Sequence, residues 1–486
     1  MDINLVPATP EIVLAVFGLA LLVIGAFVRK DAGALVSRLA FAGFGVTLAL
    51  VCLMAGWTTV QEGLNGLFID DAFARFAKIL VLASAMIVLA MSESWFRRDD
   101  ALQAEFPVLV VFAVVGMMVM VSANDLMAVY MGVELQSFAL YILAAYQRTS
   151  AKSTEAGVKY FILGALASAV MLYGMSLVYG FAGTTHFAGI AHVAADGARP
   201  VGIVVGLVFV AAGFAFKVSA VPFHMWAPDV YEGAPTPITA FFAVAPKIAA
   251  LALFARVMVD PFGPWIKDWQ QVLLVLSILS MSLGAVAAIA QTNIKRLMAY
   301  SSIGHVGYAL IGITAGTHDG IRGMLVYLAI YLVMNVATFA LILSMRQGGQ
   351  PVERLSDLAG LSRTAPWAAA AVTVLMFSMA GIPPLAGFFG KFYVFMAAID
   401  AKLYTLAIIG VVTSVIGAFY YLRIVKIMYF DEVGTPLDEF TSRVNSSVLF
   451  GGSALVLLGF LGMDWLVTSA QFAGDALLKH AAAALF

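Results

Sequence analysis

The chain has 486 residues, of which 62% are hydrophobic and only 11% are charged, with a formal net charge of −1. Soluble proteins carry about 25% charged residues, so this composition excludes a soluble globular protein. Cys52 is the single cysteine, which excludes a disulfide framework and an iron–sulfur cluster held by this chain alone.

Apolar segments of the length needed to cross the hydrocarbon of a bilayer, about 20 residues, follow one another along the sequence. The alternating strands of a β-barrel are absent, and so are the glycine-rich motifs of nucleotide sites. The N-terminal segment has no basic region or small-residue cleavage site, so we expect it to be a retained span. The predicted fold is an all-α membrane protein with about fourteen transmembrane helices. The expected spans are 11–28, 36–57, 73–93, 106–122, 124–146, 157–180, 201–222, 237–258, 270–290, 299–315, 321–345, 367–399, 402–429 and 447–468.

The basic residues are distributed unevenly between the two sets of loops. One set holds Arg29, Lys30, Arg38, Arg97, Arg98, Arg148, Lys152, Lys159, Lys295, Arg296, Arg346, Arg354, Arg363, Arg423, Lys426 and Arg443. The other set and the C-terminal tail hold Arg199, Arg256, Lys267, Arg322, Lys402 and Lys479, and Arg75 and Lys78 can snorkel from the start of the third span. Because basic loops stay on the cytoplasmic side, both termini are predicted to be periplasmic, as an even number of spans also requires.

Three lysines remain inside the predicted spans: Lys217, Lys247 and Lys391. A lysine at the bilayer centre costs about 2.5–3.5 kcal/mol, so such residues usually have a function. Lys247 lies ten residues into its span, about 15 Å deep, whereas Lys217 and Lys391 could also snorkel from a helix break.

The complementary charge is Glu134, ten residues past Asn124 in the fifth span. A carboxylate and a lysine whose separation can change form a proton switch, because each group stabilises the charged form of the other. Lys217 is the predicted partner, although a neutral, hydrogen-bonded glutamate is an alternative. His305 and His224 are candidate relay members or packed structural residues; His186, His192, His318 and His480 are expected in loops or the tail.

Two spans are predicted to be broken. Residues 367–399 are too long for one straight span and contain Gly381-Ile382-Pro383-Pro384, and the seventh span is interrupted at Pro222. Breaks at matching places in two halves are typical of transporters with inverted repeats, although both could be simple kinks. The predicted organisation is a three-helix segment (1–105), two inverted five-helix repeats (106–258 and 259–429), each with a broken helix, and a last span with its tail (430–486).

The strings FKVSAVPFHMWAPDVYEGAPTPITAFF, MGVELQSFALYIL and QTNIKRLMAYSSIGHVGY resemble the proton-translocating antiporter-like subunits of respiratory complex I and of Mrp-type antiporters. The similarity covers nearly the whole chain. Within that family the chain resembles the N-type subunits of bacterial complex I, because it ends soon after the last span and carries Lys391 where M-type subunits have a glutamate.

This resemblance implies a coupling of electron transfer from NADH to quinone, in other subunits, to proton translocation in the bacterial inner membrane. Its implied relay residues are Glu134, Lys217, Lys247 and Lys391, with lesser contributions from Lys159, His224, Lys295 and His305. It implies no cofactor or metal on this chain, FMN, iron–sulfur clusters and quinone in partner subunits, M-, K- and J-type membrane-arm neighbours, and no nucleic acid. The rival hypotheses are a cation/proton antiporter, a solute transporter and a purely structural subunit.

Overall fold

The computed structural model describes residues 4–28, 31–54, 59–98, 101–195, 200–439 and 441–483. Arg29, Lys30 and Arg199, which contributed to the loop charges above, lie outside these ranges. Almost all of the described chain is helical, and the only strands in it are two short antiparallel hairpins. The hairpins are β1 (Gln61–Gly63) with β2 (Phe68–Asp70) and β3 (Arg346–Gln347) with β4 (Gln350–Pro351).

The helices follow the predicted order of spans. The first part of the chain forms α1 (Thr9–Phe27), α2 (Ala32–Leu53), α3 (Ala72–Arg98), α4 (Glu105–Val121), α5 (Leu126–Ala144), α6 (Ala151–Ala182), α7 (Phe187–Ala195), α8 (Val201–Val218), α9 (Trp226–Gly233) and α10 (Thr236–Val259). The second part forms α11 (Ile266–Ile289), α12 (Ile294–Ala315), α13 (His318–Ser344), α14 (Leu361–Thr364), α15 (Pro366–Ala380), α16 (Ala386–Asp400), α17 (Tyr404–Phe430), α18 (Arg443–Leu458) and α19 (Met463–Ala483).

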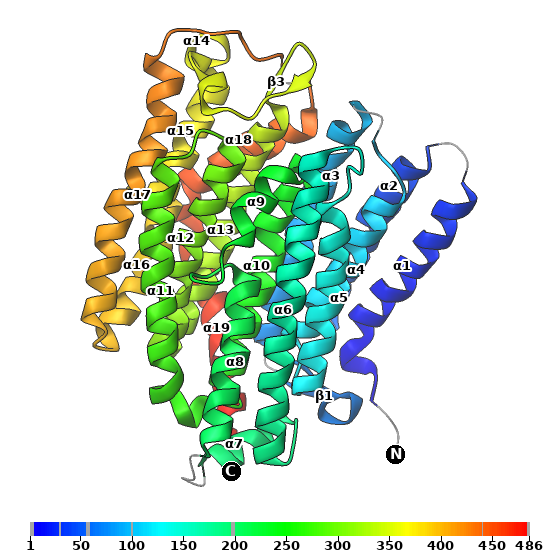
Figure 1. The fold of residues 1–486 in the computed structure, drawn as a ribbon, viewed down its shortest axis with the longest axis vertical. Coiled ribbons are helices and arrows are strands. Elements are labelled where there is room, and N and C mark those ends of the chain that lie inside the picture. Colours follow the sequence, from blue (N-terminus) through cyan, green and yellow to red (C-terminus); the bar gives the residue numbers. More distant parts are fainter. Residues whose placement is uncertain are drawn as a thin grey trace.

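The helices form one elongated bundle, with α1 and α2 at one edge and α16 and α17 at the opposite edge (Figure 1). Within the described residues, eleven helices are long and apolar enough to cross a membrane, and α4 and α15 are shorter apolar helices. The chain is therefore an all-helical membrane protein, as predicted. We refer to the end of the bundle that carries β1 and α7 as the β1 end, and to the end that carries β3 and α14 as the β3 end.

Helix α10 forms the centre of the bundle, and every one of its residues is buried. It packs against α3, α4, α8, α12 and α13. A helix that is apolar on all sides is typical of the core of a large protein or of a membrane span, and α10 occupies the core. Lys247 and Arg256 on α10 are consequently surrounded by protein.

Both predicted helix breaks are present. Helix α8 ends at Val218, where Ser219 has a left-handed backbone (φ 60°), and the chain becomes helical again at Trp226. Helix α15 ends at Ala380, where Gly381 has φ 89°, and α16 begins at Ala386. Glycine adopts this backbone geometry at little cost, which explains a helix end at this position.

The C-terminal part differs from the prediction. The last span was expected at 447–468 and followed by a tail, but α18 and α19 are separated by a 3₁₀ turn (Gly459–Gly462), and α19 continues to Ala483. Helix α19 packs against α3 and α13. Residues 463–483 contain Asp464, Asp475, Lys479 and His480, so the segment is too polar to be predicted as a transmembrane helix. In the structure it is a helix that is partly covered by protein.

Candidate functional site

Lys217 lies at the end of α8, directly before the first helix break, and is 7% exposed. Its ammonium donates hydrogen bonds to Ser137 Oγ on α5 (2.7 Å), to Ser168 Oγ on α6 (3.3 Å) and to the Tyr141 hydroxyl on α5 (3.5 Å). The break leaves backbone N–H and C=O groups inside the bundle without helical hydrogen bonds, and other protein groups must bond to them there. Lys217 is therefore held by polar partners from two other helices and does not snorkel.

Glu134 lies one turn before Ser137 on α5, so it is near Lys217 but does not form an ion pair with it. The carboxylate is close enough to act electrostatically on Lys217. Its Oε1 atom is buried and has no hydrogen-bond partner within the described part of the chain. The structure thus brings the predicted acid and base to one site, where Lys217 bonds to Ser137 and has no hydrogen bond or ion pair with Glu134 among the described residues.

Lys247 approaches the same break from the opposite side. It follows Pro246 within α10 and is 1% exposed, and its ammonium donates to Ser219 Oγ at 2.7 Å. The ammonium also lies 5.5 Å from the centre of the Tyr231 ring. Ser219 begins the first break two residues after Lys217, so both lysines adjoin this break, and no hydrogen bond among the described residues links one lysine to the other.

Helix α13 connects α10 to α12 beyond Lys247. The Tyr331 hydroxyl donates to the Ala243 carbonyl, one turn before Lys247, and is 2.8 Å from Ser302 Oγ on α12. Ser302 lies one turn before His305. Tyr331 and Ser302 thus place two hydroxyl groups within about one helical turn of Lys247 and His305, but no hydrogen bond in the described part of the chain joins these hydroxyls to either side chain.

His305 is buried in the middle of α12 and is held at both ring nitrogens. Nδ1 is 2.6 Å from the Tyr327 hydroxyl, and Nε2 is 2.9 Å from the Tyr421 hydroxyl, which contacts Ser301 Oγ at 2.6 Å. His305 also interacts electrostatically with both Lys247 and Lys391. A histidine bonded on both sides can accept a proton at one nitrogen and release one from the other.

Lys391 lies after the second break, and is 6% exposed. Its ammonium donates to the carbonyls of Met379 (3.0 Å) and Ala380 (2.9 Å), and to Ser414 Oγ on α17 (2.8 Å). These carbonyls form the end of α15, where the helix dipole stabilises a cation.

A small cavity of about 10 Å³ lies between His305 and Lys391 and is also lined by Tyr308 and Ser414. That volume is close to the minimum that one water molecule needs. His305 and Lys391 therefore border a space about as large as one water molecule. We call the groups Lys217, Ser219, Lys247, Tyr331, Ser302, His305 and Lys391 the buried row.

The other predicted site residues lie outside the buried row. The side chain of Lys159 is 42% exposed and pairs with Glu155 (2.6 Å) and Asp229 (2.8 Å). Lys295 is buried and pairs with Glu353 at 2.7 Å. His224 lies in the first break, half-buried, with Nδ1 unpaired among the described residues.

Sequence reasoning missed three ion pairs on the β1 side of the bundle. Lys78, expected to snorkel, is fully buried and pairs with Glu11 at 2.7 Å. Arg256, assigned to a loop, is a buried residue of α10 that pairs with Asp71 at 2.8 Å. His480, assigned to the tail, lies on α19 and contacts Asp260 at 2.8 Å. The sequence feature that indicates these pairs is a charged residue within or directly beside an apolar segment.

Asp71 precedes α3 and accepts hydrogen bonds from Arg256 and from the Ala74 amide. Burial alone would raise the pKa of Asp71, but the charge of Arg256 and these hydrogen bonds outweigh burial and hold the pKa below its usual value. The pair therefore stays ionised and fastens the start of α3 to the end of α10. No group of three or more potential metal ligands occurs within the described ranges.

The fold and the site define the class: a polytopic helical membrane protein with ionisable side chains buried beside broken helices, as in ion-translocating proteins. The NADH:quinone oxidoreductase/Mrp antiporter transmembrane family matches residues 123–417, and the chain belongs to this family. The resemblance predicted from the sequence strings is confirmed.

Similar proteins cover the rest of the chain. NADH-quinone oxidoreductase subunit N of Rhodospirillum rubrum is 63% identical, over 97% of each chain, and that of Paramagnetospirillum magneticum is 57% identical, over 99% of each. A chain of respiratory complex I from Thermus thermophilus is 31% identical, with a TM-score of 0.81 over 95% of this chain and 99% of that one.

Proposed function

We propose that this chain is the N-type subunit of a bacterial NADH:quinone oxidoreductase and translocates protons through the buried row. The relatives that match it almost end to end bear the name of that subunit. The single observation that carries the proton-relay proposal is the placement of three buried lysines and a buried histidine from one helix break to the other, each held by hydroxyl or carbonyl groups.

Each member of the row has a distinct task in this proposal. Lys217 and Lys247 exchange a proton across Ser219, and a change in the distance between Glu134 and Lys217 biases that exchange. His305 passes the proton onward between its two tyrosine partners, and Lys391 delivers it at the second break. A buried lysine suits this task because it gains and loses a proton readily.

Lys159 and Lys295 have a lesser role at the β3 end. Asp229 on α9 accepts hydrogen bonds from Lys159 (2.8 Å) and from Arg296 (2.7 Å). This partly exposed cluster adjoins the first break, and His224 lies within that break. We assign these groups to proton uptake.

FMN, iron–sulfur clusters and quinone belong to partner subunits, and the membrane neighbours are M-, K- and J-type subunits.

The organisation that we propose has fourteen spans with inverted repeats at 106–258 and 259–429, flanked by 1–105 and 430–486. Its support is a parallel in packing: α4 packs along α5 as α11 does along α12, and α4 meets α10 as α11 meets α17. Lys217 precedes its break whereas Lys391 follows its own, so the two lysines occupy non-equivalent positions in the repeats.

The proposed orientation places both termini in the periplasm, and cysteine labelling tests it. In a Cys52→Ser background, Gln350→Cys and Thr435→Cys should react from the cytoplasmic side and Ala195→Cys from the periplasmic side, because basic loops remain inside. All three sites are exposed. Reversed reactivity at any two sites would contradict the orientation.

Lys217→Ala should lower proton translocation several-fold while electron transfer continues. The substitution removes the buried cation that Ser137 and Ser168 hold, and leaves Glu134 without its nearby charge. The measurement is the quench of a pH-gradient dye in vesicles during NADH oxidation.

The matched control is Lys426→Ala, since the side chain of Lys426 is 63% exposed and pairs with Asp431 on the surface. The control variant should retain wild-type quenching. Equal quenching by both variants and the wild type would remove Lys217 from the relay.

A further inference from the structure

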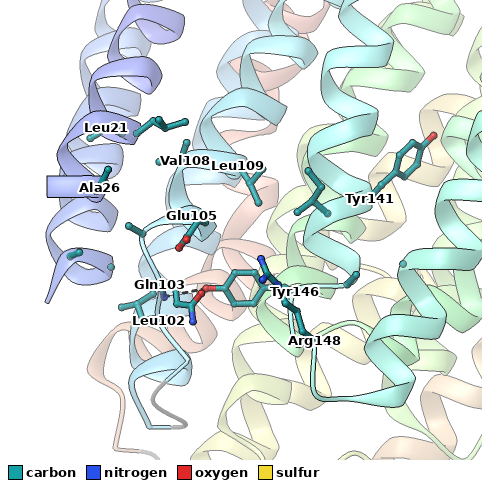
Figure 2. Close-up of a pocket in the computed structure, with 18 of the residues that line it drawn as sticks. Leu21, Ala26, Leu102, Gln103, Glu105, Val108, Leu109, Tyr141, Tyr146 and Arg148 are labelled. Carbon is teal, nitrogen blue, oxygen red and sulfur yellow. Dashed lines mark hydrogen bonds between the residues drawn. The ribbon is translucent and has the colours of Figure 1, made fainter. Parts of the chain in front are cut away.

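A large groove lies between α1, α4, α5 and α6 near the β3 end (Figure 2). Its volume is about 1540 Å³. Sites for small molecules have about 300–1,000 Å³, so this groove suits a larger ligand. None of the buried-row residues lines it.

The wall of the groove is apolar and faces outward from the bundle. Ile142, Val158 and Phe161 line it, and each is about half exposed. From Thr154 at the mouth to Phe161, the wall extends for about 10 Å at 1.5 Å per residue. In a bilayer such a surface contacts hydrocarbon, so the wall fits part of an acyl chain.

The mouth of the groove is polar and carries both signs of charge. Arg148 and Glu105 point toward it from opposite sides of Tyr146 (Figure 2). The Tyr146 hydroxyl is already engaged, since it donates to the Ala101 carbonyl and accepts from the Gln103 amide.

Arg148 and Glu105 are exposed, and within the described part of the chain neither side chain has a hydrogen bond or an ion pair. Two further charges line the mouth. Arg97 is paired with Glu93 at 3.0 Å, and Asp31 adds a second carboxylate. The mouth therefore offers an available cation and two carboxylates.

We propose that this groove binds a phospholipid with a primary amine, of the phosphatidylethanolamine class. The phosphate binds Arg148, the ammonium binds Glu105, and one acyl chain lies along Ile142, Val158 and Phe161. Guanidinium–phosphate and ammonium–carboxylate bonds are both charge-assisted and strong. A lipid with only negative charge would be repelled by Glu105 and Asp31, and a quaternary amine offers no N–H to a carboxylate.

The test uses photoactivatable lipids with a diazirine on the acyl chain, added to the intact complex purified in mild detergent. The ethanolamine lipid should label peptides that contain Ile142 and Phe161 several-fold more than the matching glycerol or choline lipids. Arg148→Gln and Glu105→Gln should each reduce this labelling several-fold. The control Lys426→Gln removes a cation that is 63% exposed and does not line the groove, and it should change nothing.

A second variant tests the wall without changing the charge. Val158→Trp should narrow the groove and reduce labelling while the mouth remains intact. Equal labelling by the three lipids would overturn the proposal, as would full labelling of both charge variants. Cross-links from the wall to a neighbouring subunit instead of lipid would also overturn it, because they would show that protein covers the groove.

Discussion

Replacing Lys391 by arginine is expected to block proton translocation as severely as replacing it by alanine. The Met379 and Ala380 carbonyls and the Ser414 hydroxyl can accept hydrogen bonds from either cation, so the contacts at the second break survive in Lys391→Arg. Arginine keeps its proton at all accessible pH values, however, and cannot pass it on. Each proton moved against 100 mV stores about 2.3 kcal/mol, and a group that never releases its proton cannot do that work.

The measurement is dye quenching in reconstituted vesicles, with assembly of the complex checked on native gels. Lys391→His and Lys391→Glu should recover part of the signal, since both residues can titrate. Lys426→Arg is the matched control, because Lys426 is 63% exposed and pairs with Asp431 on the surface. Full quenching in Lys391→Arg would mean that this residue only joins helices by charge.

The largest expected loss of stability follows from breaking the Asp71–Arg256 pair. Arg256 Nη2 donates to both carboxylate oxygens (2.8 and 3.0 Å), and its Nε donates to the Val121 carbonyl, so three helix ends meet there. Both side chains are 0% exposed. Asp71→Ala leaves an unpaired buried cation, which costs about 3–5 kcal/mol. The thermal unfolding midpoint of the purified complex should fall accordingly.

Two comparisons of unfolding midpoints show whether the loss of stability comes from the broken ion pair or from lost packing. The surface pair Lys426–Asp431 should contribute at most about 1 kcal/mol, so Lys426→Ala should scarcely lower the midpoint. The double variant Asp71→Leu/Arg256→Met removes both charges together and should recover part of the loss. An Asp71→Ala midpoint equal to that of Lys426→Ala would show that the pair does not stabilise the bundle.

The main features of the site were predictable because charge is rare in apolar spans. Lys217, Lys247 and Lys391 stand out for this reason, and the structure buries all three beside the predicted breaks. The breaks themselves follow from Pro222 and from Gly381 with its two following prolines. Local residue chemistry determines these features, so they appear in the sequence.

The connections between the charged residues were not predictable. Tyr327, Tyr331 and Tyr421 hold His305 and join it to other helices, but tyrosines and serines in a span look like ordinary packing residues. The direct Glu134–Lys217 contact was also expected, whereas Ser137 takes the bond. Such contacts depend on how helices rotate against each other, which the helical pattern of one chain does not specify.

The relay itself is tested most directly at Lys247, the member at the centre of the bundle. The measurement is the number of protons translocated per NADH oxidised, in vesicles that contain the complex with Lys247→Ala or, as control, Lys426→Ala. Lys247→Ala removes the titratable group of the row that lies between Ser219 and His305, so its ratio should be clearly lower, while Lys426→Ala should match the wild type. A wild-type ratio in the assembled Lys247→Ala complex would contradict proton transfer along the buried row.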